Sequence, residues 1–242
     1  MESAHFIIPP GSGTWWLGLA FVALYGCVIW SWGRAGGQQS RRFWERVWAA
    51  GIFLFWLGGQ MFLVMQGWWR FNNDLPLHLC GISNLLSVAV LMGHYRRMFV
   101  PLFFWGIVGG VHALLTPEVT TGSHPLLVAE YYVYHSSIVI VPLYLMGVHG
   151  WRLGRHDWLR ALLYNNLLLI PIFAVNLLLG ANYMFLIEPP AASNPFVAGD
   201  WPYYILGFEL AALMHYLLLS VLFRSNGRYA FAMERTPLKT NH

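Results

Sequence analysis

The stretch Asp74-Leu-Pro-Leu-His-Leu-Cys-Gly-Ile-Ser-Asn84 begins an apolar run that continues to Tyr95. A run of about 20 mostly apolar residues is long enough to cross the hydrocarbon core of a bilayer as one helix. Pro76 suits the first position of such a helix, because its ring holds φ at a helical value and its missing N–H would have no partner there. The stretch therefore predicts a membrane-spanning helix that begins at Pro76, with His78 and Cys80 near its N-terminal end.

The composition of the whole chain agrees with a membrane environment. The 242 residues are 57% hydrophobic and only 10% charged, with a mean hydropathy of +0.52. An ordinary soluble domain has about 25% charged residues. The chain also has 13 Trp, 12 Tyr and 16 Phe, and amphipathic aromatic rings collect at the two membrane–water interfaces. These properties predict an all-α, polytopic integral membrane protein.

Outward from this stretch, the same length criterion predicts seven transmembrane helices. The third and fourth are separated only by Arg96 and Arg97, so they are expected to form a tight hairpin. We find no internal repeat and no soluble segment, and we expect a single domain over residues 1–242. The predicted spans lie near 14–32, 47–68, 76–95, 98–115, 125–148, 158–179 and 201–223.

The basic residues predict the orientation in the membrane. The formal charge is +4, and arginine is concentrated in the loops after odd-numbered spans and in the C-terminal tail. The opposite loops contain one arginine, Arg70. Because cytoplasmic loops carry an excess of Lys and Arg, we expect the N-terminus outside and the C-terminus in the cytoplasm. Basic residues in short loops indicate topology, so we expect membrane lipid and no nucleic acid as a partner.

Polar side chains within the predicted spans are concentrated in the outer half of the bilayer. A rise of about 1.5 Å per residue places His135 roughly 15 Å from the outer end of span five. Polar groups in lipid are costly, so we expect them to meet in one chamber that opens toward the outer face. The candidate members are His78, Cys80, His112, Glu130, Tyr134, His135, Asn182, Glu209 and His215.

Four short motifs carry a resemblance to a known family. They are Leu75-Pro-Leu-His-Leu-Cys80, Glu130-Tyr-Tyr-Val-Tyr-His135 with Val141-Pro-Leu-Tyr144, Ala181-Asn-Tyr-Met-Phe-Leu186 and Asp200-Trp-Pro-Tyr-Tyr204. In this order they resemble the YwaF family of bacterial integral membrane proteins, which implies a multi-pass protein of the bacterial plasma membrane.

A more distant resemblance is to the animal transmembrane-protein-164 family, whose members transfer fatty acyl chains between phospholipids through a cysteine. That family has a Pro-Cys-His pattern, and this chain matches it at Pro76 and His78 but has Leu77 at the cysteine position. It also has a Tyr-Tyr-x-x-His pattern, which Tyr131 to His135 match. The resemblance implies lipid-directed acyl transfer or hydrolysis.

The acyl-transfer hypothesis assigns roles to the candidate residues. Cys80 is the available thiol, and a thiolate nucleophile needs a base. His78 and Cys80 lie about 200° apart on an ideal helix, so His135 from another helix is the better base. His78 could also take the proton, and otherwise it would orient the substrate or pair with Glu130. The candidate catalytic residues are therefore Cys80, His78 and His135. The predicted substrate contacts are Glu130, Tyr134, His112, Asn182, Glu209 and His215.

Other functions stay open at this point. His, Glu and Asn at depth also suit a solute- or proton-coupled transporter or binding protein. Alternatively, the chain is a non-catalytic membrane subunit, with a second copy or another subunit as partner. A zinc site from His78, Cys80, His112 and His135 lacks the local spacing of a zinc motif, so we expect no metal and no cofactor. We assign His94, His149 and His156 to the cytoplasmic interface.

Overall fold

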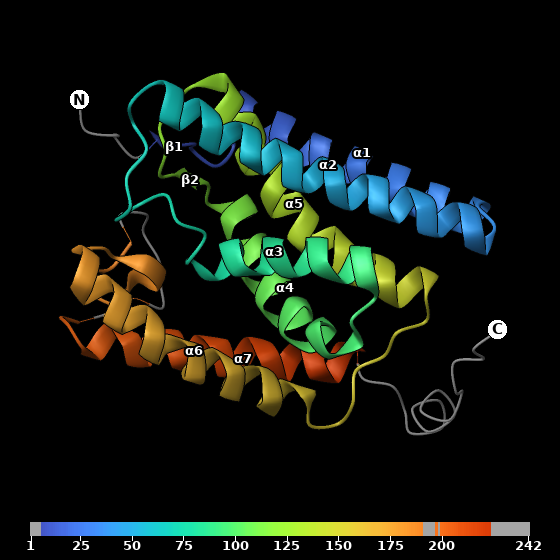
Figure 1. Cartoon of the computed structure of the whole chain (residues 1–242). Helices are drawn as coiled ribbons and strands as arrows, with labels where there is room; N and C mark the ends of the chain where they lie inside the picture. Colours follow the sequence, from blue (N-terminus) through green and yellow to red (C-terminus); the bar gives the residue numbers. More distant parts are fainter. Residues whose placement is uncertain (1–5, 191–196, 198, 224–242) are drawn as a thin grey trace.

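The computed structural model describes residues 6–190, 197 and 199–223. Over these residues the chain is mostly helical. The seven α-helices are α1 (Gly13–Ala35), α2 (Gln38–Met65), α3 (Leu79–Gly93), α4 (Phe99–Leu115), α5 (Pro125–Val148), α6 (Asp157–Leu179) and α7 (Tyr203–Phe223). Of these, α4 and α5 cross the other helices obliquely (Figure 1). The predicted all-α class is confirmed, and six of these helices are long and apolar enough to cross a membrane.

The predicted start of the third span at Pro76 is wrong by three residues, because α3 begins at Leu79. Pro76 lies in a tight turn instead, where the Leu77 N–H donates to the Leu75 carbonyl at 2.7 Å. His78 is the N-cap, with extended backbone at ψ 151°. The helix that follows has 15 residues, which makes it the short member of the bundle.

The second helix also differs from its predicted bounds, since α2 begins at Gln38 rather than at residue 47. The additional turns carry Arg41, Arg42, Glu45 and Arg46. Charged residues interrupt an apolar run in the sequence but do not interrupt a helix, because Arg and Glu are good helix formers. The apolar run therefore marks only the most hydrophobic part of a longer helix.

Between α3 and α4 the chain reverses in a tight hairpin, as predicted. His94 ends α3 in the left-handed conformation, with φ 50° and ψ 42°. A 3-10 turn, η1 (Arg96–Met98), then leads directly into α4. The left-handed residue turns the chain sharply and leaves the His94 ring at the end of α3.

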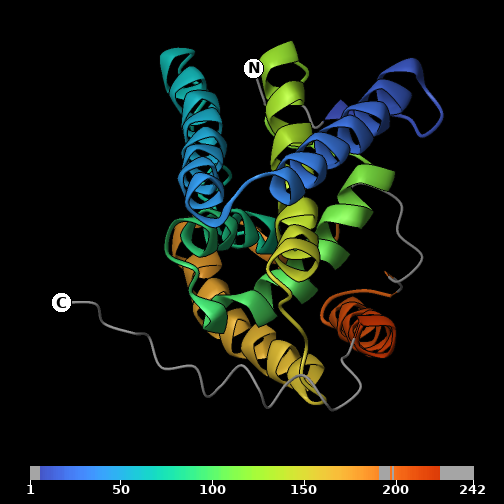
Figure 2. The ribbon, with the colours of Figure 1, turned by 90° about the vertical axis from the view of Figure 1, so that its right-hand side faces the viewer.

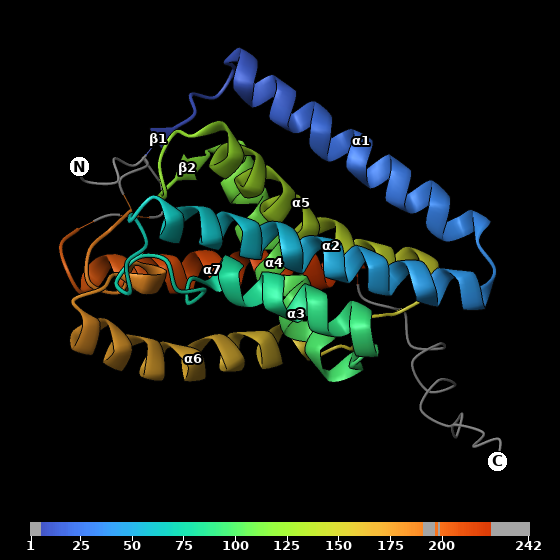
Figure 3. The same cartoon turned by 45° about the horizontal axis from the view of Figure 1, so that its top comes forward.

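The centre of the bundle is the close packing of α4 on α5. A β-carbon on Gly106 would lie 2.4 Å from the Ile138 carbonyl oxygen, so only a glycine permits this approach. Phe103 and Val141 are fully buried in the surrounding core. Seen along the bundle, α5 lies between α1 and α2 (Figure 2). In contrast α1 lies at the outer edge, and much of its apolar surface is exposed (Figure 3).

The two ends of the bundle differ in structure. One end holds a small antiparallel ribbon of β1 (Phe6–Ile7) and β2 (Glu118–Val119), with the loops after α2, α4 and α6. We call it the ribbon end, and the opposite end, with the α1–α2, α3–α4 and α5–α6 connections, the arginine end (Figure 1). The alternation of loops agrees with seven passes. The sidedness of the two ends in a membrane stays a prediction.

Candidate functional site

A cavity of about 610 Å³ lies among α3, α4, α5, α6 and α7 and reaches the loops of the ribbon end. Most of its wall is apolar, which suits a ligand with hydrocarbon parts. Eight of the nine candidate residues line it, and they come from four helices and the α3 N-cap. These are His78, Cys80, His112, Glu130, Tyr134, His135, Glu209 and His215.

Cys80 lies in the first turn of α3, at the cavity wall. A β-carbon on Gly109 of α4 would lie 3.0 Å from the Cys80 Sγ, so the thiol occupies the space that this glycine leaves. The preceding turn is packed just as closely, because a β-carbon on Gly81 would lie 2.7 Å from the Pro76 carbonyl oxygen. The backbone N–H groups of a first helical turn have no intrahelical partner, so they are available to an anionic group near the thiol.

His135 lines the same cavity from α5 and is 9% exposed. Its Nδ1 lies 2.9 Å from the Tyr131 carbonyl oxygen, which can only accept, so Nδ1–H is the donor. In a neutral imidazole the other nitrogen is then an acceptor. The hydrogen bond therefore leaves Nε2 able to take a proton, which is the requirement for a general base.

The imidazole ring of His78 contacts the loop between α6 and α7. Its Nδ1 accepts a hydrogen bond from the Met184 N–H at 3.2 Å, in the short helix η2 (Tyr183–Phe185). Its ring also lies edge-on to Tyr183, with centroids 5.4 Å apart. His78 thus ties the start of α3 to the α6–α7 loop through a loop N–H. Leu77 packs on the apolar cluster around Tyr183 and lies outside the cavity lining.

A pair of histidines faces the cavity from α4 and α7. The Nε2 atoms of His112 and His215 lie 3.2 Å apart. His215 Nδ1 lies 2.6 Å from the Ala211 carbonyl oxygen, so it carries a proton and its Nε2 is the acceptor. His112 Nε2–H is then the donor. This pair crosslinks two helices that the sequence separates by 103 residues.

Two of the glutamates that line the cavity, Glu209 and Glu130, differ in their partners. Glu209 accepts hydrogen bonds from the side-chain amides of Asn165 at 3.3 Å and Asn166 at 3.0 Å, both on α6. Glu130 contacts Gly59 of α2, and among the described residues it has no hydrogen bond or ion pair. Of these two carboxyls, Glu130 is therefore the one that is available to a ligand.

Asn182 is the candidate residue that the cavity lining does not include, within the described part of the chain. Its amide donates to the Glu188 carbonyl at 2.9 Å and accepts from the N–H groups of Ile187 and Glu188. These bonds shape the loop between α6 and α7. The sequence could not distinguish this loop role from a substrate contact, because asparagine suits both.

The mouth of the cavity is held by the loop before α3. Asp74 accepts from the Arg70 N–H at 2.7 Å and from the Asn73 amide at 3.0 Å, and burial raises the pKa of its carboxyl. The Tyr183 hydroxyl donates to the Phe71 carbonyl at 2.7 Å and accepts from the Leu75 N–H. These contacts join the α2–α3 loop to η2 at the cavity entrance.

Sequence reasoning missed two features that the structure brings out. One is Gly109, which has no side chain to suggest its role beside the thiol. The other is a cluster of Glu45, His94 and His149 at the arginine end, whereas the sequence predicts only that each histidine lies at the interface. Both histidines lie at the end of a predicted helix, and this position is the one indication that the sequence offers. Nothing in the sequence indicates that either histidine lies near Glu45.

The fold and the cavity together define a class of protein. It is a polytopic helical membrane protein with a chamber between its helices, and the wall of this chamber is mostly apolar but includes several polar side chains. A model of the TMEM164 family matches residues 8–220, and the chain belongs to this family. The family match covers all seven helices except the end of α7. Comparison with curated proteins found no match, and comparison with solved structures found none.

Replacement of Gly109 with alanine is expected to slow the reaction of Cys80 with a thiol reagent several-fold. The new methyl group would lie 3.0 Å from Sγ, and the thiol would have to move out of its present rotamer. The measurement is the rate of labelling by a long-chain maleimide, read by mass spectrometry of the Cys80 peptide. Gly58→Ala on α2 is the matched control, because nothing lies within 4 Å of its β-carbon. Equal slowing in both variants would refute a contact between the 109 position and the thiol.

Proposed function

We propose that the cavity is the active site of a lipid-directed acyltransferase or hydrolase, with Cys80 as nucleophile and His135 as base. The observation that carries the proposal is that Cys80 and His135 line one cavity, with the Nδ1 of His135 bonded to Tyr131. A mostly apolar wall around these polar groups suits an acyl chain. Membership of the TMEM164 family and the resemblance to membrane acyltransferases support the same chemistry.

The first step forms an acyl-thioester. His135 Nε2 takes the proton from the Cys80 thiol, and the thiolate attacks the ester carbonyl of a phospholipid. The carbon–oxygen bond to the glycerol breaks, and His135 returns the proton to the leaving alkoxide, so a lysophospholipid departs. The N–H groups of the first turn of α3 lie beside Cys80 and would stabilise the oxyanion.

The second step reverses the first with a new acceptor. A hydroxyl group of another lysophospholipid, or water, gives its proton to His135 as its oxygen attacks the thioester. The carbon–sulfur bond breaks and the thiol is restored. A lipid acceptor completes acyl transfer, whereas water completes hydrolysis. Glu130 and Tyr134 would contact the bound lipid. The His112–His215 pair would form the wall of the chamber between α4 and α7.

The position of Cys80 differs from that of the nucleophile in the animal proteins that the chain resembles. Their cysteine corresponds to Leu77, whose side chain here packs on the cluster around Tyr183. Cys80 is three residues further along and lines the cavity. We therefore assign the role of nucleophile to Cys80, which lies near the same helix start as the cysteine of the animal proteins but three residues further along.

The test is detection of the acyl-thioester. The purified protein in lipid nanodiscs is incubated with a phospholipid carrying an isotopically labelled acyl chain, and its peptides are examined by mass spectrometry. We expect the label on the Cys80 peptide, removal by neutral hydroxylamine, and no label on the exposed Cys27. A thioester on Cys27, or none on either cysteine with turnover still present, would overturn the assignment. Complete lack of turnover over a range of phospholipids would favour the transporter or subunit alternatives.

We further propose that the protein works in a bacterial plasma membrane, with the ribbon end and its cavity mouth outside. The one-sided distribution of arginine supports this orientation. The YwaF-like motifs support the bacterial source. Accessibility of single cysteines placed in the α2–α3 and α5–α6 loops to an impermeant reagent, in intact cells, measures which end is outside.

A further inference from the structure

A second polar cluster lies at the arginine end, away from the cavity. It combines Glu45 of α2 with two histidines that follow helices: His94 is the C-cap of α3 and His149 the C-cap of α5. Glu45 is fully buried, although it lies only eight residues into its helix. None of the three lines the cavity described above. The cluster therefore has a role outside the proposed acyl chemistry, and it joins three helices.

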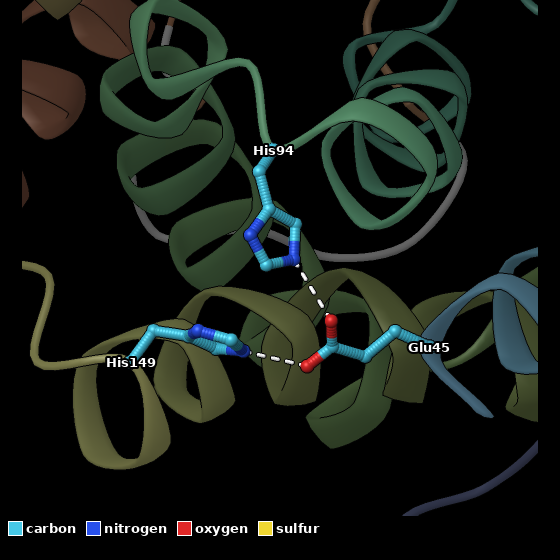
Figure 4. A group of neighbouring side chains, drawn as sticks. All are labelled: Glu45, His94 and His149. Atoms are coloured by element: carbon cyan, nitrogen blue, oxygen red, sulfur yellow. Dashed lines mark hydrogen bonds and ion pairs between the residues drawn. The ribbon is translucent and has the colours of Figure 1, made fainter. Parts of the chain in front are cut away.

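The three side chains converge on one point (Figure 4). His149 Nε2 lies 2.5 Å from Oε1 of Glu45, and His94 Nε2 lies 2.8 Å from Oε2. The rings are almost perpendicular, at 85°, with centroids 4.6 Å apart. One ligand atom from each residue lies within 4.8 Å of the other two. Two imidazole nitrogens and a carboxylate oxygen are thus gathered from sites 49 and 104 residues apart.

We propose that Glu45, His94 and His149 bind a divalent transition-metal ion of the Zn²⁺ type. Imidazole nitrogen with a carboxylate is a donor set that zinc accepts, whereas Mg²⁺ and Ca²⁺ prefer oxygen ligands. Three protein ligands leave a fourth position for water. The donor set, its burial and its convergence from three helices point to an ion that fastens the arginine end of the bundle.

Small movements of the side chains suffice to admit the ion. Ligands at about 2.1 Å around a tetrahedral zinc ion are roughly 3.4 Å from one another. The carboxylate-to-nitrogen separations of 2.5 and 2.8 Å would therefore widen by less than about 1 Å. Without the ion, each Nε2–H donates to the carboxylate. With it, each Nε2 lone pair binds the metal and the ring proton resides on Nδ1.

The surroundings of the cluster are compatible with an ion. The Tyr144 hydroxyl donates to Oε1 of Glu45 at 2.6 Å and would orient the carboxylate as an outer hydrogen bond. The Arg42 guanidinium lies 3.9 Å from Oε2, but its side chain is 39% exposed and free to turn toward solvent. Both histidine side chains are 16% exposed, which provides a path for the ion from the arginine end.

The experiment measures metal binding by the purified full-length protein. The protein carries a tag without histidine, is reconstituted in nanodiscs, is treated with a chelator and is then dialysed against Zn²⁺. We expect one zinc per chain by elemental mass spectrometry. With Co²⁺ as a probe, we expect the visible absorption of a tetrahedral ion, which is displaced by Zn²⁺. This spectrum needs no variant, so it tests the site even where a substitution impairs folding.

Matched variants locate the ion. Glu45→Gln and His149→Gln keep the size of each side chain, and each is expected to weaken zinc binding at least tenfold. His156→Gln, at an exposed histidine of the same end, is expected to leave it unchanged. Zinc should also raise the Tm of the unmodified protein but not that of Glu45→Gln. No retained zinc and no Co²⁺ spectrum in the unmodified protein would overturn the proposal, as would equal binding in the Glu45→Gln/His149→Gln double variant.

Discussion

Replacement of Cys80 with alanine is expected to lower acyl transfer by roughly 10³-fold or more, because no second thiol lines the described part of the cavity. The readout is the initial rate of labelled acyl transfer from phospholipid to lysophospholipid in nanodiscs. Cys27→Ala, at an exposed thiol of α1, is the matched control and should retain the full rate. A Cys80→Ala protein with an undiminished rate would exclude the thiol from the chemistry.

His135 belongs to the same prediction, since a base and its nucleophile act as a unit. His135→Ala is expected to cost about 10²–10⁴-fold, which is the usual contribution of general acid–base catalysis. The double variant should lose little more than Cys80→Ala alone, because effects within one catalytic unit are not additive. Fully additive losses would indicate that the histidine acts on substrate binding and not on the thiol.

Gly106→Ala is expected to cause the largest loss of stability among single methyl additions along α4. The new β-carbon would lie 2.4 Å from the Ile138 carbonyl oxygen, and a backbone atom within a helix cannot rotate aside as a side chain can. The two helices must separate locally, and overpacking of this kind costs about 1–3 kcal/mol. Small residues permit such close helix approaches inside membranes.

The measurement is an unfolding titration with increasing concentrations of a denaturing detergent, in which circular dichroism reports the loss of helix. Gly58→Ala on α2 is the control, because open space surrounds its β-carbon and the exchange of a helical glycine for alanine is neutral or mildly stabilising. We expect the midpoint to fall for Gly106→Ala and to hold or rise for Gly58→Ala. A common shift in both variants would indicate an effect of glycine loss in general and would contradict the packing argument.

The solvent and the seven helices were predictable because they follow from local composition. An apolar run of membrane length can only satisfy its backbone polar groups as a helix, so spans four and five were predicted to within one residue of their bounds. The predicted bounds are wrong where something other than hydropathy decides where a helix begins. Pro76 sits in a turn because Gly81 lets the backbone pack against it, and α2 extends through Glu45 because charge does not stop a helix.

Membership in the cavity was partly predictable, since polar groups in lipid must find one another or a polar space. Cys80 and His135 were named from that reasoning, and both line the cavity. Their roles in catalysis stay predictions. Asn182 was named by the same reasoning but bonds within its loop, because depth along a helix says nothing about which way a side chain beyond the helix end will turn.

The sequence by itself thus determined the bilayer as solvent, the helical class and the approximate position of each polar group along its helix. These properties depend on neighbours along the chain, where hydrophobicity and helical rise act residue by residue. Only the tertiary structure decided that His135 keeps Nε2 available, that Gly109 makes room for a thiol, and that Glu45 meets His94 and His149. Each of these depends on the rotation of one helix against another, and side-chain packing between helices sets that rotation.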